Sequence, residues 1–240
     1  DGAKMSTSRN PGRVTGLWYL LLVAIGPLTL IYIPNKLIVP ENPGATVANI
    51  AAHEWLYRSG MAADLVGALV LILLVMAFYR LFKGVDQHLA VLVIIFGGVM
   101  PALIYFVNVV SSAGALLLVQ GGGFVSVFDN QQRNALVMLF LRLHDYQITA
   151  AEMLWGVWLF PLALLVYRSG FLPRFLGVWL IINGLAYVIM SLTGFLLPQY
   201  QETVFRLGQP AFLGEIALML WLLIKGAPPA IPATTLAAAA

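Results

Sequence analysis

Residues 61–82 read MAADLVGALVLILLVMAFYRLF, and this stretch decides the fold. Asp64 near its start and Arg80 near its end are its only charged residues. The hydrocarbon core of a bilayer is about 30 Å thick, and a helix rises about 1.5 Å per residue, so about 20 mostly apolar residues are needed to cross it. The stretch therefore predicts a membrane-spanning helix.

Five further stretches have the same character. The six expected spanning helices are Gly16–Ile33, Met61–Phe82, Leu89–Val119, about Ile148–Tyr167, Phe171–Leu197 and Phe212–Ile224. Helical lead-ins to the second and fourth are expected from Thr46 and Asn134. Pro101 removes a backbone donor, which predicts a kink in the third helix. Pro210 suits the first turn of the sixth.

The composition supports the same class of protein. Hydrophobic residues make up 61% of the chain, charged residues make up 10%, and the mean hydropathy is +0.91. Soluble domains are about 45–50% apolar and about 25% charged. A soluble protein with a large core is the alternative, but this chain has too few charged side chains to cover its exterior. We therefore predict an all-α fold, a polytopic transmembrane bundle of about six spanning helices.

Composition also excludes several kinds of chemistry and partner. The chain has no cysteine, which excludes disulfides, thiolate metal sites and cysteine nucleophiles. The net charge of +3 is spread along the chain, so no nucleic-acid partner is expected. No closely spaced metal-ligand motif is present, so no metal site is expected. We expect no cofactor.

The distribution of positive charge predicts the orientation. Six crossings put both termini on one side. Eight Lys and Arg residues fall on that side: Lys4, Arg9, Arg13, Arg80, Lys83, Arg168, Arg174 and Lys225. Five fall on the other: Lys36, Arg58, Arg133, Arg142 and Arg206. The positive-inside rule therefore predicts cytoplasmic termini. The expected location is the inner membrane of a bacterium.

A single domain is expected. Residues 15–226 form the six-helix transmembrane domain, between a cytoplasmic N-terminal tail (1–14) and a Pro/Ala-rich C-terminal tail (227–240). The four residues before Met5 are expected to be vector-derived. We expect the first helix to be retained rather than cleaved as a signal peptide, because its apolar stretch is long and no small-residue cleavage motif follows it.

Three stretches carry a family resemblance. They are ANIAAHEWLYRSGMAADLVG (Ala48–Gly67), RSGFLPRFLGVWLIINGLAYVIMSLTGFLLP (Arg168–Pro198) and GEIALMLWLLIKG (Gly214–Gly226). Together and in this order they resemble the bacterial integral-membrane family known as domain of unknown function 4386, over nearly the whole chain. The resemblance implies a single multi-helix membrane domain and implies no activity.

Ionisable side chains within the spans are the candidates for chemistry. Each costs about 2.5–3.5 kcal/mol at a helix centre, and it persists where it pairs, faces water or acts. Most acids fall on the predicted outer side or in the outer halves of helices: Glu41, Glu54, Asp64, Asp129, Asp145, Glu152, Glu202 and Glu215. The sequence therefore predicts a site toward the outer face.

The first group of candidates is His53, Glu54, Arg58 and Asp64. Helical spacing places His53 and Asp64 on one face, and Glu54 and Arg58 are an i, i+4 pair. Either this segment is an interfacial helix with a surface ion pair, or Glu54 or His53 points into the bundle as an acid or base.

The second group is Arg142, His144, Asp145 and Glu152. Asp145 and Glu152 share a helix face, and Glu152 begins a strongly apolar run. Shielding from water favours the neutral form of a carboxyl unless a cation such as Arg142 compensates, and a neutral carboxyl can act as a general acid. The alternative is structural: Arg142 pairs with Asp145, and Glu152 caps a helix start.

Glu215 is the third candidate and is the only ionisable residue between Arg206 and Lys225. Lipid exposure is costly, so we expect Glu215 to face the bundle. It should lie about one turn into the sixth helix, roughly 6–8 Å below its outer end. A structural salt bridge to Arg58 or Arg142 is the alternative.

Neutral polar and aromatic side chains accompany these acids. Two polar stripes, Asn108/Ser111/Ser112 and Asn183/Tyr187/Ser191, are explained by interhelical hydrogen bonds without any ligand. The aromatic residues fit either an interfacial belt or the wall of a pocket for a long apolar ligand. They are Trp55, Tyr57, Tyr105, Phe106, Tyr146, Trp155 and Trp158.

These considerations give one set of candidate residues. The predicted catalytic acids and bases are Glu54, Asp145, Glu152 and Glu215. The predicted substrate-binding residues are His53, Arg58, Asp64, Asn108, His144, Trp155, Asn183 and Tyr187.

The function favoured by this set is a membrane-embedded enzyme acting on a lipid or isoprenoid. It would use carboxylic-acid general acid/base chemistry, such as protonation-initiated cyclisation or isomerisation, in an aromatic-lined cavity toward the outer leaflet. Membrane-bound terpene cyclases are similar in mechanism, although no sequence motif is shared. Membrane lipids are the expected partners. The alternatives are a non-enzymatic binding, sensor or accessory protein, and a proton- or cation-coupled transporter, although the sequence shows no internal repeat or paired broken helices.

Overall fold

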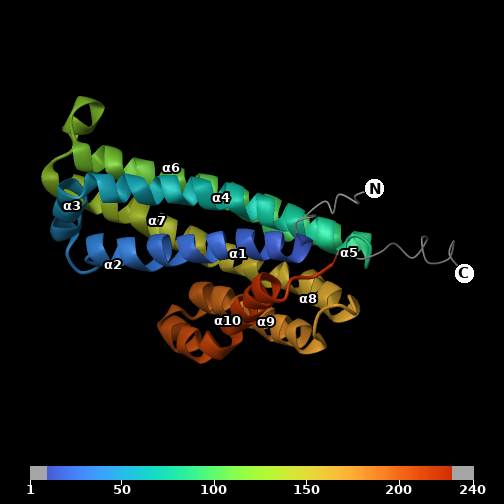
Figure 1. The fold of residues 1–240 in the computed structure, drawn as a ribbon. Helices are drawn as coiled ribbons and strands as arrows, with labels where there is room; N and C mark the ends of the chain where they lie inside the picture. The colour runs from blue at the N-terminus through green and yellow to red at the C-terminus, as the bar shows by residue number, and fades with distance from the viewer. Residues whose placement is uncertain (1–9, 229–240) are drawn as a thin grey trace, which may run out of the picture.

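The computed structural model describes residues 10–228, which are helical almost throughout (Figure 1). In chain order the elements are α1 (Pro11–Pro27), η1 (Leu28–Tyr32), α2 (Ile33–Leu37), α3 (Pro43–Ala52), α4 (Glu54–Phe82), α5 (Gln87–Ile94), η2 (Ile95–Val99), α6 (Met100–Gln120), η3 (Gly123–Val127), α7 (Asn130–Val157), α8 (Leu159–Arg168), α9 (Arg174–Leu196), η4 (Pro198–Tyr200) and α10 (Gln201–Ile224). The segments η1 and η2 are π-helical, whereas η3 and η4 are 3-10 turns. Most of the predicted tails, 1–14 and 227–240, lies outside the described residues.

Six helical runs are long and apolar enough to cross a membrane. They are Pro11–Leu37, Glu54–Phe82, Gln87–Gln120, Asn130–Arg168, Arg174–Leu196 and Pro198–Ile224. The prediction of an all-α, polytopic membrane bundle with six spans is therefore confirmed. The lead-ins predicted ahead of the second and fourth spans are helical, although a break at His53 separates the first of them, α3, from α4.

The sixth span begins earlier than predicted. Helix α10 starts at Gln201, so the expected start at Phe212, with Pro210 in the first turn, is wrong. Pro210 lies inside the helix and donates no backbone bond. Its carbonyl accepts a hydrogen bond from Trp179 Nε1 at 3.0 Å, the kind of neighbouring contact that lets membrane helices tolerate proline. Glu215 consequently lies about 21 Å along α10 rather than one turn into it.

Prolines also explain the two π-helical segments. Pro34 and Pro101 each lie two residues beyond such a segment, η1 and η2 respectively. Because proline has no N–H, the usual i→i−4 bond is lost there. The preceding turn widens to i→i−5 bonds, from the Ile33 N–H to the Leu28 carbonyl and from Met100 to Ile95. At Pro101, where the sequence predicts a kink, the helix therefore has a π-turn.

Side-chain caps determine where several helices begin. Asn42 accepts a hydrogen bond from the Ala45 N–H at 2.9 Å ahead of α3, and Asp86 accepts one from Leu89 at 3.1 Å ahead of α5. A capping box begins α7, formed by Asp129 and residue 132. These side chains satisfy N–H groups that the first turn of a helix leaves free.

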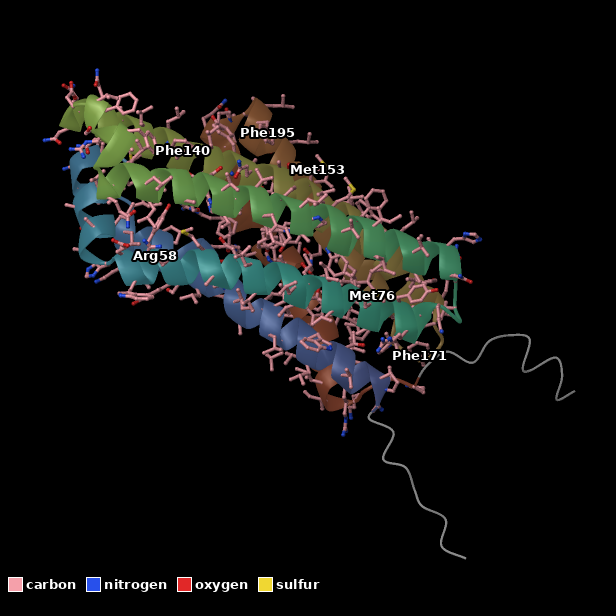
Figure 2. All side chains as sticks on the ribbon, turned by 90° about the horizontal axis from the view of Figure 1, so that it is seen from above. Arg58, Met76, Phe140, Met153, Phe171 and Phe195 are labelled. Atoms are coloured by element: carbon pink, nitrogen blue, oxygen red, sulfur yellow. The ribbon has the colours of Figure 1, made fainter. Side chains whose placement is uncertain are left out.

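The six spans form a ring. Helix α1 packs against α4 and α10, α4 against α6, α6 against α7, α7 against α9, and α9 against α10. Residues 10 and 228 lie at one end of the bundle, here called the terminal end, whereas α2, α3 and η3 lie at the opposite, distal end (Figure 1). Phe171 and Arg58 lie toward these two ends respectively (Figure 2).

Two buried clusters divide the bundle along its length. The cluster near the terminal end draws on α1, α4, α5, α8, α9 and α10, around residues such as Phe78 and Leu162. The distal cluster draws on α2, α3, α4, α6, η3 and α7, around Leu37 and Val137. Among the described residues, α9 and α10 contribute nothing to the distal cluster. The bundle is therefore closed by all six spans only toward its terminal end.

Hydrogen bonds and close packing hold the start of α1 against the residues that follow α10. The Gly12 N–H donates to the Ala227 carbonyl at 3.1 Å, and the Ala227 N–H donates to Asn10 Oδ1 at 3.0 Å. A Cβ atom on Gly12 would lie 2.2 Å from the Ala227 nitrogen, and one on Gly16 would lie 2.8 Å from the Leu223 nitrogen. This pair of glycines, four residues apart, lets α1 approach the end of α10 closely.

Replacing Asn10 with alanine should therefore weaken the terminal end. The change removes the cap that accepts from the Arg13 N–H, as well as the bond from Ala227. Loss of such a cap costs about 1 kcal/mol, which corresponds to a fall in melting temperature of roughly 2–4 °C at this size. Thermal unfolding of the detergent-solubilised protein measures it. Asn35→Ala removes an exposed amide with no recorded hydrogen bond, and an equal fall there would contradict the assignment.

Candidate functional site

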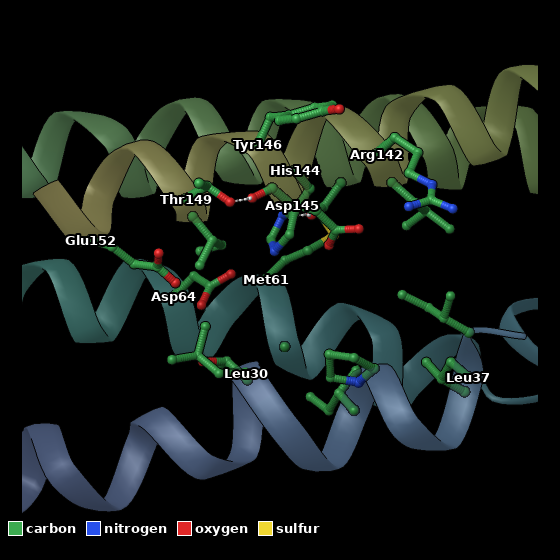
Figure 3. Close-up of a pocket in the computed structure, with 18 of the residues that line it drawn as sticks. Leu30, Leu37, Met61, Asp64, Arg142, His144, Asp145, Tyr146, Thr149 and Glu152 are labelled. Carbon is green, nitrogen blue, oxygen red and sulfur yellow. Dashed lines mark hydrogen bonds between the residues drawn. The ribbon is translucent and has the colours of Figure 1, made fainter. Parts of the chain in front are cut away.

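A polar cavity of about 430 Å³ lies between the first span, α4, α7 and the α9–α10 turn. We call it the polar cavity, and Figure 3 shows it in close-up. Its polar lining residues are Thr29, Tyr57, Asp64, Ser112, Arg142, His144, Asp145, Tyr146, Thr149, Glu152 and Gln201. Four predicted site residues thus meet here, Asp64 from α4 and His144, Asp145 and Glu152 from α7.

Asp64 and Glu152 lie across this cavity from each other. Figure 3 shows both side chains reaching into the space between α4 and α7, Asp64 from α4 and Glu152 from α7. Each lies 16 residues from a basic residue at the terminal end of its own span, Arg80 or Arg168, which is about 24 Å along the helix. Measured from the terminal end, a hydrocarbon core of about 30 Å would include both carboxyls just inside its far boundary.

Glu152 is buried and incompletely satisfied. Its side chain is 7% exposed, and its Oε2 atom has no hydrogen-bond partner within the described part of the chain. It lies well inside α7, so it does not cap a helix start, and Arg142 forms no ion pair among residues 10–228. A buried polar atom without a partner is costly, and native proteins keep few of them. The Oε2 atom of Glu152 is therefore open to a further hydrogen bond.

His144 occupies the distal side of the same cavity. Its Nδ1 atom lies 3.3 Å from Ser112 Oγ on α6, which fixes the ring. Ser111, one residue earlier, exchanges hydrogen bonds with Gln147 Oε1 and Nε2 at 3.2 and 3.0 Å. These contacts lock α6 to α7 and thereby hold the α7 face that carries Asp145 and Glu152.

A second cavity, of about 320 Å³, lies nearer the terminal end of the bundle. We call it the aromatic cavity, because six rings line it: Tyr19, Tyr105, Trp155, Trp158, Tyr187 and Phe212. The ring centroids of Tyr187 lie 5.9 Å from those of Trp155 and 4.7 Å from those of Phe212. Thr29 and Leu30 line both cavities, so η1 lies at their junction.

Among residues 10–228, Glu215 is the one carboxyl that lines the aromatic cavity. Tyr19 Oη donates a hydrogen bond to its Oε1, and Asn183 Nδ2 donates to its Oε2 at 3.3 Å. Glu215 lies ten residues from Lys225, about 15 Å along α10 and so near the middle of a bilayer core. Its recorded partners are neutral donors rather than Arg58 or Arg142, so the structural salt bridge considered above does not form.

Loss of the Tyr19 hydroxyl should destabilise the bundle. Tyr19→Phe leaves one buried oxygen of Glu215 unpaired, at a cost of about 1–3 kcal/mol. In a Glu215→Leu background the same Tyr19→Phe change should cost much less, because the hydroxyl then has no carboxyl partner to lose. Thermal unfolding in detergent measures the change in both backgrounds, with Tyr79→Phe as the control. An equal cost of Tyr19→Phe in both backgrounds would contradict the pairing.

This chain is similar to known proteins. The domain of unknown function DUF4386 matches residues 14–226. The chain belongs to the DUF4386 family. The family resemblance is thus confirmed over the whole transmembrane domain. An uncharacterized protein of Archaeoglobus fulgidus is 35% identical over 71 residues, which cover 30% of this chain and 41% of the archaeal protein. No solved structure matches the chain.

Five predicted site residues of this DUF4386 protein line neither cavity, and three of them, His53, Glu54 and Arg58, lie on the surface near the start of α4. Glu54 begins α4 and forms an exposed ion pair with Arg58, with 2.7 Å between Oε1 and Nε. Its Oε1 also accepts a hydrogen bond from Gln120 Nε2 at 2.9 Å. His53 is exposed at the break between α3 and α4. The structure thus has the surface ion pair that was the first alternative for His53, Glu54, Arg58 and Asp64. Asp64 is the member of this group that lines a cavity.

The remaining predicted binding residues divide between packing and the aromatic cavity. Trp155 and Tyr187 line the aromatic cavity, and Asn183 reaches its acid. Asn108 is fully buried, and its Oδ1 has no partner within residues 10–228, but it lines neither cavity. Ser191 Oγ donates to the Thr149 carbonyl at 2.7 Å. The prediction of interhelical hydrogen bonds from the two polar stripes is therefore confirmed for Ser111, Ser112, Asn183 and Ser191 of this DUF4386 chain.

The aromatic residues divide between the wall of a cavity and the outer surface of the bundle. Tyr105, Trp155 and Trp158 line the aromatic cavity. Trp55 and residue 106 instead face outward, with Trp55 85% exposed. Sequence reasoning missed Tyr19 and Thr29, because the first span reads as a plain apolar helix. The only signals were the hydroxyl groups of these two residues and, for Thr29, the proline five residues later, Pro34, which accompanies the π-helical segment.

Among residues 10–228, no three His, Asp or Glu side chains are grouped so that they could hold one metal ion. The polar cavity is lined by carboxyls, hydroxyls, an imidazole and a guanidinium. Such groups bind polar ligands and transfer protons.

Proposed function

We propose that the protein is a membrane-embedded enzyme that acts on a lipid or isoprenoid by general acid/base catalysis. The observation that carries this proposal is the pair formed by Asp64 and Glu152, which reach from α4 and α7 into a cavity adjoining an aromatic one. Acid/base catalysis needs one group that gives a proton and another that takes one, on two sides of the reacting atoms. The aromatic cavity suits an apolar chain and a transient carbocation.

The reaction that fits this pair best is the isomerisation or cyclisation of a double-bonded substrate. Glu152 donates its proton to one carbon of the double bond, which leaves a cation on the neighbouring carbon. The Asp64 carboxylate removes a proton from the next carbon, and a new double bond forms. In a cyclisation a second double bond attacks the cation first. Asp64 then releases its proton to water and Glu152 takes up a proton from water, which restores the starting state, so that no oxidant or cofactor is consumed.

The other acids flank this pair in the proposal. Asp145 lies with Arg142 and His144 at the distal side of the polar cavity, where a polar head group is held. Glu215 orients Tyr19 and Asn183 at the wall of the aromatic cavity. Glu54 lies on the surface and receives no role.

The same proposal includes an orientation in the membrane. The described basic residues at the terminal end are Arg13, Arg80, Lys83, Arg168, Arg174 and Lys225, and Asp86 is the only described acid there. The positive-inside rule then puts the terminal end in the cytoplasm, and the polar cavity toward the outer leaflet of a bacterial inner membrane.

Deuterium labelling tests the proposed reaction. The purified protein is reconstituted in nanodiscs that contain bacterial polar lipids and polyprenols, and is incubated in heavy water. Each turnover exchanges one carbon-bound hydrogen for deuterium, which mass spectrometry detects in the product. The double variant Asp64→Asn/Glu152→Gln is expected to incorporate none. The matched control is Glu202→Gln, at an exposed acid paired with Arg206. No incorporation by the unmodified protein, or equal incorporation by the double variant, would contradict the proposal.

A further inference from the structure

The two cavities are continuous in their lining and differ in character. Thr29 and Leu30 of η1 line both of them. On one side of this junction lie the carboxyls of Asp64 and Glu152, and on the other lie aromatic rings. Polar and apolar compartments that share a wall match a ligand with a polar head and an apolar chain. Their volumes, about 430 and 320 Å³, are of the size that small-molecule sites have.

The ring of helices is incomplete beside these cavities. Within the described chain, η1 packs mainly against α1, α2 and α4, and α2 packs mainly against η1, α3 and α4. No residue of η1 is buried, and α10 has no buried residue before Gly214. Leu30 and Ile31 of η1 and Phe212 and Ile216 of α10 nevertheless line the aromatic cavity. The gap between η1 and the first half of α10 is therefore a side opening of that cavity.

The side opening faces the bilayer. Its flanks carry exposed apolar side chains, Ile31 on η1 (54% exposed) and Leu213 on α10 (49% exposed). Glu215, just inside, lies near the middle of the hydrocarbon core by helix length. A ligand that passes this opening comes from the lipid phase and enters with its apolar part.

The charges of the polar cavity select the head group. Three acids line this cavity, Asp64, Asp145 and Glu152, and two basic residues line it, Arg142 and His144. The free Oε2 atom of Glu152 is an acceptor or donor of hydrogen bonds that no described residue satisfies. A head with hydrogen-bond donors, a hydroxyl or an ammonium group, complements three acids, whereas an anionic head meets like charge.

From these observations we infer that the two cavities form one site for an amphiphile that enters from the bilayer between η1 and α10. Its hydroxyl- or ammonium-bearing head lies at the distal side of the polar cavity, with Asp145 and His144, and the reacting part of its chain lies between Asp64 and Glu152. The rest of its apolar chain lies in the aromatic cavity. This inference rests on the proposed function for the site and adds the class of substrate and the route by which it enters.

Brominated amphiphiles test the inference without any need for turnover. Bromine quenches the fluorescence of an indole that it contacts, and Trp155 and Trp158 line the aromatic cavity. Terminally brominated dodecylamine, dodecanol and dodecanoic acid are titrated into nanodiscs at equal mole fractions. The saturable part of the quenching separates binding from general partitioning into lipid. The amine and the alcohol are expected to bind at least about tenfold more tightly than the acid.

A matched pair of variants locates the binding. Gly26 lines the aromatic cavity, and a Cβ atom there would meet nothing within 4 Å, so Gly26→Leu fills the cavity without a clash. Ala24 is exposed on the same helix and lines neither cavity, so Ala24→Leu adds bulk outside it. Saturable quenching is expected to fall at least about tenfold in Gly26→Leu and to persist in Ala24→Leu.

The results separate this inference from the proposed function. No saturable quenching, equal binding of all three head groups, or equal binding by Gly26→Leu overturns the inference, even if deuterium incorporation is observed. Saturable, head-selective quenching that Gly26→Leu removes supports the inference. If such quenching is observed and no substrate incorporates deuterium, the site is a binding site and the enzyme proposal fails.

Discussion

Replacing Glu152 with glutamine is expected to lower turnover by about 100-fold to 10,000-fold, the contribution that a positioned acid or base makes to catalysis. Glutamine keeps the size of the side chain and one carbonyl oxygen, but it has no proton to donate to carbon. Glu152 reaches into the polar cavity from α7, opposite α4 and its Asp64 (Figure 3). No other described carboxyl on α7 has the same position. The initial rate of deuterium incorporation measures the effect.

A stability measurement separates catalysis from packing at this position. The Oε2 atom of Glu152 has no partner within residues 10–228, so its burial costs free energy. Glu152→Met should therefore raise the melting temperature, with a gain of about 1 kcal/mol, while turnover is lost. A lower melting temperature in Glu152→Met would mean that the carboxyl stabilises the fold, and the catalytic assignment would be withdrawn.

Replacing Gly156 with leucine is expected to prevent the bundle from forming. The backbones of α7 and α9 are in contact here: a Cβ on Gly156 would lie 2.6 Å from the Gly184 carbonyl oxygen and 2.8 Å from Val188 Cγ2. A Cβ on Gly184 would lie 2.9 Å from the Gly156 oxygen. Small residues permit such approach between membrane helices, and a large side chain forces them apart at a cost of about 3 kcal/mol or more. Size-exclusion chromatography measures the yield of monodisperse protein.

The control for this prediction is the same substitution in open space. Gly26 is also helical, and its Cβ would meet nothing within 4 Å, so Gly26→Leu should keep a monodisperse peak. Gly156→Ala should fall between the two, with a lower melting temperature. If Gly156→Leu behaves like Gly26→Leu, the helices approach each other less closely than the structure indicates.

The fold was predictable because a bilayer restricts its options. A span must satisfy its own backbone and present apolar side chains, so hydropathy and length alone identified six helices. The helix starts were harder to predict. Pro210 lies inside α10 because Trp179 and other neighbours compensate for it, and such a contact cannot be read from local sequence.

The kind of residue at the candidate site was predictable, but which residues come together there was not. Acids in apolar helices pointed to the outer half, and Asp64, Asp145 and Glu152 meet in the polar cavity. Glu54 carries the same signal as Glu152, yet it lies on the surface, because the break at His53 makes it the first residue of α4 and Arg58 pairs with it. Which face of a helix turns inward depends on packing against distant spans, and periodicity is weak where nearly every residue is apolar.

The bonds between Asn10, Gly12 and Ala227 imply that the order of the helices along the chain can be changed without changing their arrangement in space. A short linker could join residue 10 to residue 228, and new ends could be opened in the loop at Ser169–Gly170, which lies at the same end of the bundle. Every span would then still cross the bilayer in its original direction. A circularly permuted form of this protein could thus carry a fluorescent tag or fusion partner at a new position on the same side of the membrane.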